Sequence, residues 1–204
     1  MILIIDNTKN LKEAFMTPKL LACLEKKKIP FIVASSRTEV NDIVAHQKKE
    51  IRGVILSGGP LCLSEELTIS LINKNIAVLL RLPQVPLLGI CFGFQLLVAS
   101  YGGNIVSMDK ASQGIKTVQI LSKDSPIFKN VKEKTIAVFQ SHKDKVKEVP
   151  PHFKIIAIDD AHIIQGIENK KSNIWGFQFH PEGLDSTVQI VYNFIEICYN
   201  TNGN

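Results

Sequence analysis

The sequence predicts an α/β fold: a mostly parallel open sheet flanked by helices, with antiparallel additions in the second half. Two observations support this. Over about the first hundred residues, short apolar runs alternate with stretches of helical periodicity, which is typical of a parallel sheet. Beyond residue 115, apolar segments follow one another through short polar links, which favours antiparallel pairing. No linker or repeat divides the chain, so we expect a single domain over residues 1–204.

Apolar runs and the turn residues beside them place the elements of the first half. Thr17 is expected to cap a helix that begins at Pro18, because proline fits the first helical position. Gly102 and Gly103 are expected to end the helix that follows Cys91. We predict strands at 2–5, 30–34, 52–56 and 86–90, and helices at 17–28, around 40–44, at 65–80 and at 92–101.

The second half is predicted to hold a run of strands and one closing helix. Short polar links separate the apolar segments, so neighbouring strands are expected to pair directly and to extend the first sheet. The predicted strands are 115–121, 135–139, 153–158, 162–167 and 174–179, and the predicted helix is 186–199.

Composition argues against several classes of protein. The chain has 24 basic and 19 acidic side chains and a net charge of +5, but its lysines are scattered without interleaved aromatic residues, so we expect no nucleic-acid partner. No run of about 18 uncharged apolar residues occurs, so we expect no membrane partner. The cysteines lack C-x-x-C spacing, which indicates reduced thiols in the cytoplasm and no metal site. They are Cys23, Cys62, Cys91 and Cys198.

One of these cysteines stands at the turn between a predicted strand and a predicted helix. Gly89 and Gly93 flank Cys91 at −2 and +2. A side chain presented on a sharp strand-to-helix turn needs small neighbours, as in a nucleophile elbow. The positive end of the following helix favours a thiolate there. These residues alone leave open a buried structural cysteine.

A histidine and a glutamate follow the last predicted strand. Only Pro181 separates His180 from Glu182, and we expect an extended backbone that projects both side chains to the same side. A carboxylate beside an imidazole fixes its tautomer and raises its basicity. A lone histidine at a strand end is usually structural. A thiol elbow together with a distant His-x-Glu instead predicts a nucleophile and its base.

A glycine-rich turn follows the third predicted strand. Ligands of parallel sheets bind at this carboxyl edge, and the amides of Gly58 and Gly59 could cradle a phosphate or an oxyanion. On its own the segment is also compatible with a plain turn. Beside a cysteine elbow it becomes a candidate oxyanion donor, together with the amide of Phe92.

In combination these segments resemble the class I (triad) glutamine amidotransferases. The matching segments are Gly58-Gly59, Gly89–Gln95 and Phe179–Gly183, which occur in the family's order and span most of the chain. Residues 55–60 and 141–146 further resemble loops of the amidotransferase unit of GMP synthase. Lys143 departs from that pattern, because the subfamily usually has glycine there.

The resemblance implies a flavodoxin-like amidotransferase fold and hydrolysis of glutamine to glutamate and ammonia. It implies that Cys91 attacks the side-chain amide, that His180 moves the proton and that Glu182 orients His180. It assigns the oxyanion to the amides of Gly59 and Phe92. The substrate-binding residues that it implies are Gly58, Gln95, Ser141 and His142. It implies no cofactor and no metal.

The resemblance also implies two partners, L-glutamine and a separate ATP-dependent synthetase (an ATP pyrophosphatase subunit), such as that of GMP synthase in purine biosynthesis. The sequence contains neither a Ser-Gly-Gly-Val-Asp-Ser loop nor a P-loop that would activate an ammonia acceptor. Three alternatives remain: a stand-alone γ-glutamyl hydrolase, a non-catalytic amidotransferase-like regulator and a basic nucleic-acid-binding module.

Overall fold

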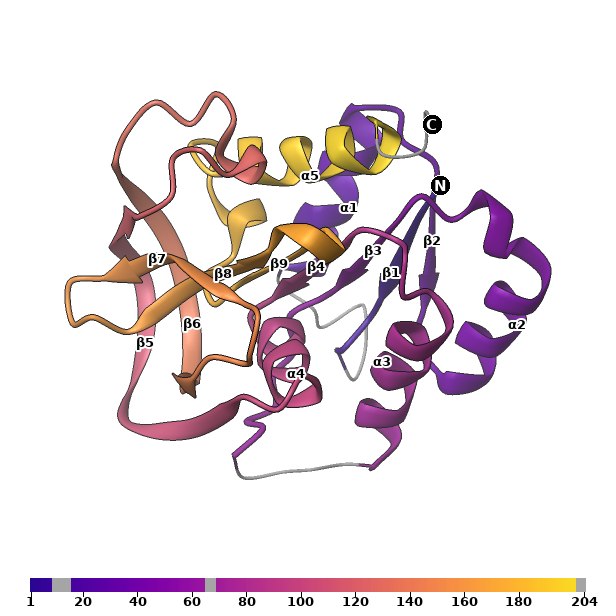
Figure 1. The fold of residues 1–204 in the computed structure, drawn as a ribbon, viewed down its shortest axis with the longest axis horizontal. Coiled ribbons are helices and arrows are strands. Elements are labelled where there is room, and N and C mark those ends of the chain that lie inside the picture. Colours follow the sequence, from indigo (N-terminus) through magenta and orange to yellow (C-terminus); the bar gives the residue numbers. More distant parts are fainter. Residues whose placement is uncertain (9–15, 65–68, 201–204) are drawn as a thin grey trace.

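The computed structural model describes residues 1–8, 16–64 and 69–200. Within them, one nine-stranded sheet runs in the order β2-β1-β3-β4-β9-β8-β7-β5-β6. Helices cover both faces of its first half, and the remaining strands extend it to one side (Figure 1). The α/β prediction, with a parallel part and antiparallel additions, is therefore confirmed.

The parallel half of the sheet consists of short, fully apolar or glycine-containing strands. They are β1 (Ile2–Ile5), β2 (Phe31–Ala34), β3 (Gly53–Leu56), β4 (Leu87–Ile90) and β9 (Ile174–Phe177). Each pairs in parallel with its neighbour. All residues of β1 are buried, because Ile2 and Ile4 face one helical layer while Leu3 and Ile5 face the other.

Five helices form the two layers among the described residues. On one side lie α1 (Thr17–Lys26) and α5 (Val188–Asn200), and on the other lie α2 (Arg37–Gln47), α3 (Ile69–Arg81) and α4 (Phe92–Ser100) (Figure 1). The predicted cap of α1 is wrong: Met16 precedes the helix, and Thr17 is its first residue. Part of the predicted helix 65–80, residues 65–68, lies outside the described residues.

A capping box begins α2. The Ser36 hydroxyl accepts a hydrogen bond from the Glu39 amide at 3.2 Å, and the Glu39 carboxylate accepts one from the Ser36 amide. These two bonds satisfy amide groups that otherwise have no partner in the first turn of a helix.

The antiparallel half is larger than predicted. It comprises β5 (Asn104–Ile120), β6 (Thr135–Glu148), β7 (Lys154–Asp159) and β8 (Ile164–Asn169). Strands β5 and β6 pair over nearly their whole length as one long hairpin, whereas the sequence predicted only 115–121 and 135–139. The outer part of β5 is mostly exposed or half-buried, and both of its faces mix polar and apolar residues, so the sequence there gives no strand-like alternation.

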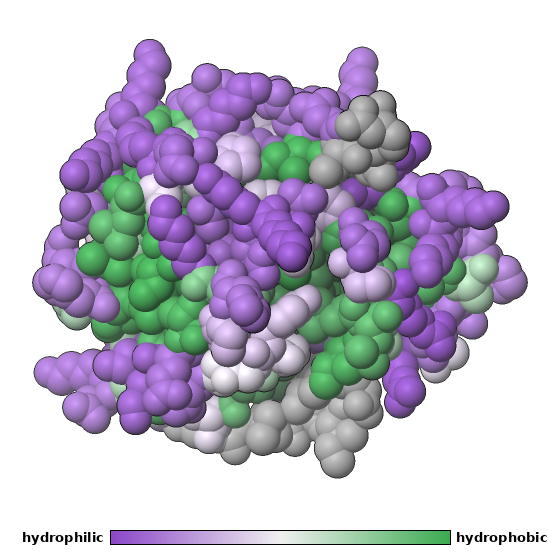
Figure 2. Space-filling view, in the orientation of Figure 1, coloured by the Kyte–Doolittle hydropathy of each residue, from purple (hydrophilic) through white to green (hydrophobic). Residues whose placement is uncertain are grey.

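Short 3₁₀ turns complete the described fold: Lys48–Glu50, Pro126–Phe128, Lys170–Ser172 and Pro181–Gly183. Hydrophilic side chains cover much of the face in Figure 2, and hydrophobic ones show between them over the β5–β8 end of the sheet. Between residues 1 and 200, leaving aside 9–15 and 65–68, no helix is both long and apolar enough to cross a bilayer.

Candidate active site

Cys91 occupies a tight turn between β4 and α4. Its backbone has φ 51° and ψ −108°, values that few residues other than glycine adopt. The Cys91 amide donates to the carbonyl of Phe177 at 2.8 Å, and its carbonyl accepts from the amide of Gln95 at 3.0 Å. These bonds to β9 and α4 hold the strained turn in place, as a nucleophile elbow requires.

The turn at Cys91 has no room for side chains at positions 89 and 93. A Cβ on Gly93 would collide with the backbone carbonyl of Leu56, and one on Gly89 would lie 2.9 Å from the carbonyl oxygen of Gly93. Both contacts are with backbone, which cannot rotate away as a side chain can. The spacing of Gly89 and Gly93 is therefore needed for the sharp turn itself.

His180 and Glu182 form a buried pair next to this turn. His180 Nδ1 lies 2.8 Å from Glu182 Oε1, and the residues are 5% and 6% exposed. The expected extended strand is wrong, because β9 ends at Phe177 and residues 181–183 form a 3₁₀ turn. The turn, rather than strand alternation, brings the carboxylate back to the imidazole.

Charge determines the protonation state of His180. Burial by itself lowers the pKa of His180, but the charges of Glu182 and Cys91 and hydrogen bonds to both raise the pKa to about 10. His180 is thus held as an imidazolium beside the Glu182 carboxylate at neutral pH. An imidazolium in this position is ready to give a proton to a leaving group.

The glycine turn lies directly over the histidine. A Cβ on Gly58 would be 2.7 Å from His180 Cε1, and one on Gly59 would be 2.5 Å from the backbone oxygen of Asn7. The Asn7 side chain donates to the carbonyl of Ser57 at 2.9 Å, and the Asn7 amide donates to the Ser57 hydroxyl at 2.9 Å. A buried asparagine therefore fixes the position of the Gly58-Gly59 backbone.

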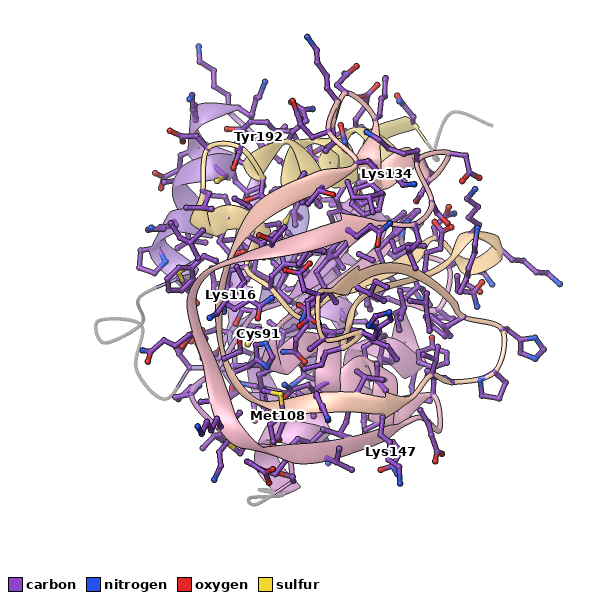
Figure 3. All side chains as sticks on the ribbon, turned by 90° about the vertical axis from the view of Figure 1, so that its left-hand side faces the viewer. Cys91, Met108, Lys116, Lys134, Lys147 and Tyr192 are labelled. Carbon is purple, nitrogen blue, oxygen red and sulfur yellow. The ribbon has the colours of Figure 1, made fainter. Side chains whose placement is uncertain are left out.

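Strand β6 forms the opposite wall. The backbone oxygen of Ser141 is 3.7 Å from Cys91 Sγ. The His142 imidazole donates from Nδ1 to the carbonyl oxygen of Asp144 at 2.8 Å, and its Nε2 lies 3.2 Å from the side-chain amide of Gln140. Burial lowers the pKa of His142, so it stays neutral beside the His180 imidazolium. The β5–β6 hairpin curves around Cys91, with Lys116 above it and Met108 below (Figure 3).

These elements enclose a cavity of about 850 Å³. Seven of the residues singled out from the sequence line it: Gly58, Gly59, Cys91, Gln95, Ser141, His142 and His180. Glu182 lies behind His180, and the Phe92 side chain packs with Leu63 and Leu96. Lys143 also lines the cavity. Among the described residues, no group of three or more His, Cys, Asp or Glu side chains could hold a metal ion.

Two buried polar residues of the site were not foreseen. Gln178 follows β9, and Asp144 on β6 binds the amide and hydroxyl of Ser64 through its carboxylate at 2.9 and 2.5 Å. Gln178 could have been noticed in the sequence, because it is a polar residue within the apolar segment that precedes His180. Asp144 gave no such signal, because it lies in a run of charged residues that is typical of a solvated strand.

The chain is similar to several known proteins. A GMP synthase [glutamine-hydrolyzing] of Fusobacterium nucleatum is 39% identical over 163 residues, which are 77% of this chain but 29% of that protein. The chain thus matches less than a third of that relative's length. A separate GMP synthase [glutamine-hydrolyzing] subunit of Pyrococcus abyssi is 33% identical over 97% of this chain and 98% of its own.

A solved structure from Thermoplasma acidophilum, ascribed to a GMP synthase subunit, superimposes with a TM-score of 0.80. It is 25% identical, and the match covers 98% of this chain and 94% of that one. The family model described as glutamine amidotransferase class-I matches residues 3–197. The chain therefore belongs to the class I glutamine amidotransferase family.

Proposed function

We propose that the protein hydrolyses L-glutamine to glutamate and ammonia with Cys91, His180 and Glu182 as its catalytic triad. One observation carries the proposal. Cys91, on a strained turn, and His180 line the same cavity, and Nδ1 of the His180 imidazolium lies 2.8 Å from Oε1 of the buried Glu182 carboxylate. Thiolate, imidazolium and orienting carboxylate are the groups needed for acyl transfer through a covalent intermediate. Membership of the family supports the same chemistry.

In the proposed reaction, Cys91 Sγ attacks the side-chain carbonyl carbon of glutamine. The amides of Gly59 and Phe92 stabilise the tetrahedral oxyanion. His180 gives its proton to the departing nitrogen, ammonia leaves and a γ-glutamyl thioester remains. Water then transfers a proton to His180 and attacks the thioester, so that glutamate leaves and the thiolate re-forms.

Substrate positioning is proposed for the remaining cavity residues. The NH₂ group of Gln95 is already engaged with Asp144 and Gln178. This leaves its oxygen as the atom that can accept from the amino group of glutamine. Ser141 and His142 would bind the same end of the substrate from β6, and Gly58 leaves room for the His180 ring.

The direct test is glutamate release from L-glutamine by the purified chain, with ammonia measured in the same samples. Equal amounts of both products would support the proposal. Faster turnover of γ-glutamyl peptides than of glutamine would identify a γ-glutamyl hydrolase instead. No turnover of either substrate, and no labelling of Cys91 by a glutamine-like electrophile, would favour a non-catalytic regulator.

We further propose that the ammonia passes to an ATP pyrophosphatase subunit that aminates XMP. Relatives with GMP synthase in their names support this: one matches the chain over 29% of its own length, and another, named as a subunit, matches over 98% of its own length. We place the reaction in the cytoplasm, because none of the four cysteines, all within the described residues, forms a disulfide. A pull-down at cellular concentration, followed by GMP formation from XMP, ATP and glutamine, tests the assignment. Recovery of no synthetase would contradict it.

Replacing Gly59 with alanine is expected to lower kcat by about 10²–10³-fold, the usual effect of losing one oxyanion donor. The new methyl group would meet the backbone oxygen of Asn7 at 2.5 Å, so the loop must shift. Steady-state kinetics with a thermal unfolding curve measures this. Gly102→Ala is the control, because no atom beyond its neighbours in the chain lies within 4 Å of its Cβ position and only backbone strain at φ 87° is added. Equal losses of kcat in both variants would contradict the expectation.

A further inference from the structure

The side chain of Gln178 lies against the proposed nucleophile. Gln178 directly follows β9 and is fully buried, and its Nε2 is 3.9 Å from Cys91 Sγ, within the range of an N–H···S hydrogen bond. The triad described above makes no use of this contact. A fully buried amide that touches a reactive sulfur must affect the relative stability of thiol and thiolate.

Neighbouring bonds determine which end of the amide faces the sulfur. The backbone oxygen of Asp144 can only accept, so the Gln95 group 3.3 Å away from it must be the NH₂ group. The same NH₂ group lies 3.2 Å from the side-chain oxygen of Gln178. Gln178 therefore accepts from Gln95 with its oxygen, and its own NH₂ group is directed at Cys91.

Two groups around the sulfur then favour opposite ionisation states. The carbonyl oxygen of Ser141, 3.7 Å from Sγ, can accept the proton of a thiol but repels a thiolate. The NH₂ group of Gln178 can only donate, and it binds a thiolate far better than a thiol, whose sulfur is a weak acceptor. Gln178 offsets the effect of the Ser141 carbonyl.

We infer that Gln178 stabilises the Cys91 thiolate by hydrogen bonding, in an orientation imposed by Gln95 and the backbone of Asp144. Asp144 is itself fixed through its carboxylate, which binds Ser64. The orientation of the amide thus depends on β6, α4 and the segment that contains Ser64. The inference concerns the ionisation of the sulfur and holds whichever amide is the substrate.

The test is the pH dependence of Cys91 alkylation by iodoacetamide, in which the thiolate displaces iodide. The tryptic peptide 82–110 contains Cys91 as its only cysteine, so mass spectrometry can follow this residue alone. In Gln178→Met, which keeps the volume but has no donor, the pH of half-maximal alkylation is expected to rise by about one unit. In Gln178→Glu, which places a carboxylate beside the sulfur, the rise is expected to be larger.

Gln165→Met is the matched control, because Gln165 is equally buried but its NH₂ group binds Asp159 at 3.0 Å. Its alkylation midpoint is expected to match that of the unaltered chain. Gln95→Met is expected to raise the midpoint when Gln178 is present, and to add nothing to Gln178→Met. A midpoint that is unchanged in folded Gln178→Met, or equal in its Met and Glu variants, would overturn the inference. Should Gln178→Met fail to fold, Gln178→Glu and Gln95→Met decide it by the same readout.

This experiment is independent of glutamine turnover. A chain that released no glutamate would overturn the proposed function but could still show the shift in alkylation. A chain that hydrolysed glutamine with no shift in Gln178→Met would retain the proposed function and lose the role of Gln178.

Discussion

Cys91→Ala is expected to lower glutamate release from L-glutamine by at least about 10⁴-fold. The alanine variant has no sulfur to form the γ-glutamyl thioester, and the remaining oxyanion donors can only assist direct attack by water. The effect is the largest that we expect from one substitution, since no second thiol is held between His180 and the carbonyl of Ser141 in the part of the chain that the structure describes. A coupled glutamate dehydrogenase assay measures the release.

The matched control for this experiment is Cys198→Ala, which removes a buried sulfur from α5 at a site outside the cavity. Its activity per folded molecule is expected to equal that of the unaltered chain. Residual turnover of Cys91→Ala near the native rate would mean that the reaction does not pass through Cys91. Thermal unfolding curves of both variants separate loss of chemistry from loss of fold.

Glu182→Gln is expected to lower kcat/KM by about 10³–10⁴-fold, because it removes the charge that holds His180 as an imidazolium. Burial alone lowers the pKa of His180, and Glu182 is the largest of the contributions that raise the pKa to about 10. Without that charge the pKa of His180 falls. The imidazolium, and with it the general acid, is then lost at a lower pH.

The sign of this shift can be measured in the pH–rate profile. The unaltered chain should keep its imidazolium up to about pH 10, whereas the alkaline limb of Glu182→Gln should move toward neutral pH. Glu196→Gln is the control, because Glu196 lies on α5 in an exposed pair with Lys129. An alkaline limb that stays in place in Glu182→Gln would show that another group sets the charge of His180.

Much of the fold was predictable because its buried half is apolar in every position. The strands around Ile4, Ile55 and Leu88 are recognisable from composition alone, and glycines and prolines mark their ends. The outer parts of β5 and β6 were not predictable, because the alternate buried positions of β6 there are mostly polar, namely Gln140, His142 and Asp144. The backbone hydrogen bonds that pair the two strands form whatever the polarity of the side chains, so the sequence there resembles that of a loop.

The site shows the same division between local and non-local information. Cys91 and His180 were identifiable because the residues that indicate their roles lie beside them in sequence: Gly89 and Gly93 flank the cysteine, and Glu182 follows the histidine. The roles of Gln178 and Asp144 depend on contacts between residues far apart in sequence, which no local pattern encodes. The turn at residues 181–183 was predicted as extended because Pro181 is compatible with both backbone shapes.

The position of β9 between β4 and β8 has a consequence for synthesis on the ribosome. A nascent chain contains the sequence of β4 early, but one edge of β4 stays unpaired until residues 174–177 emerge. His180 follows only a few residues later. The strand that closes the sheet and the base that completes the site therefore arrive together. Until then the nascent chain lacks both the Phe177 carbonyl that holds the turn at Cys91 and the imidazole of His180.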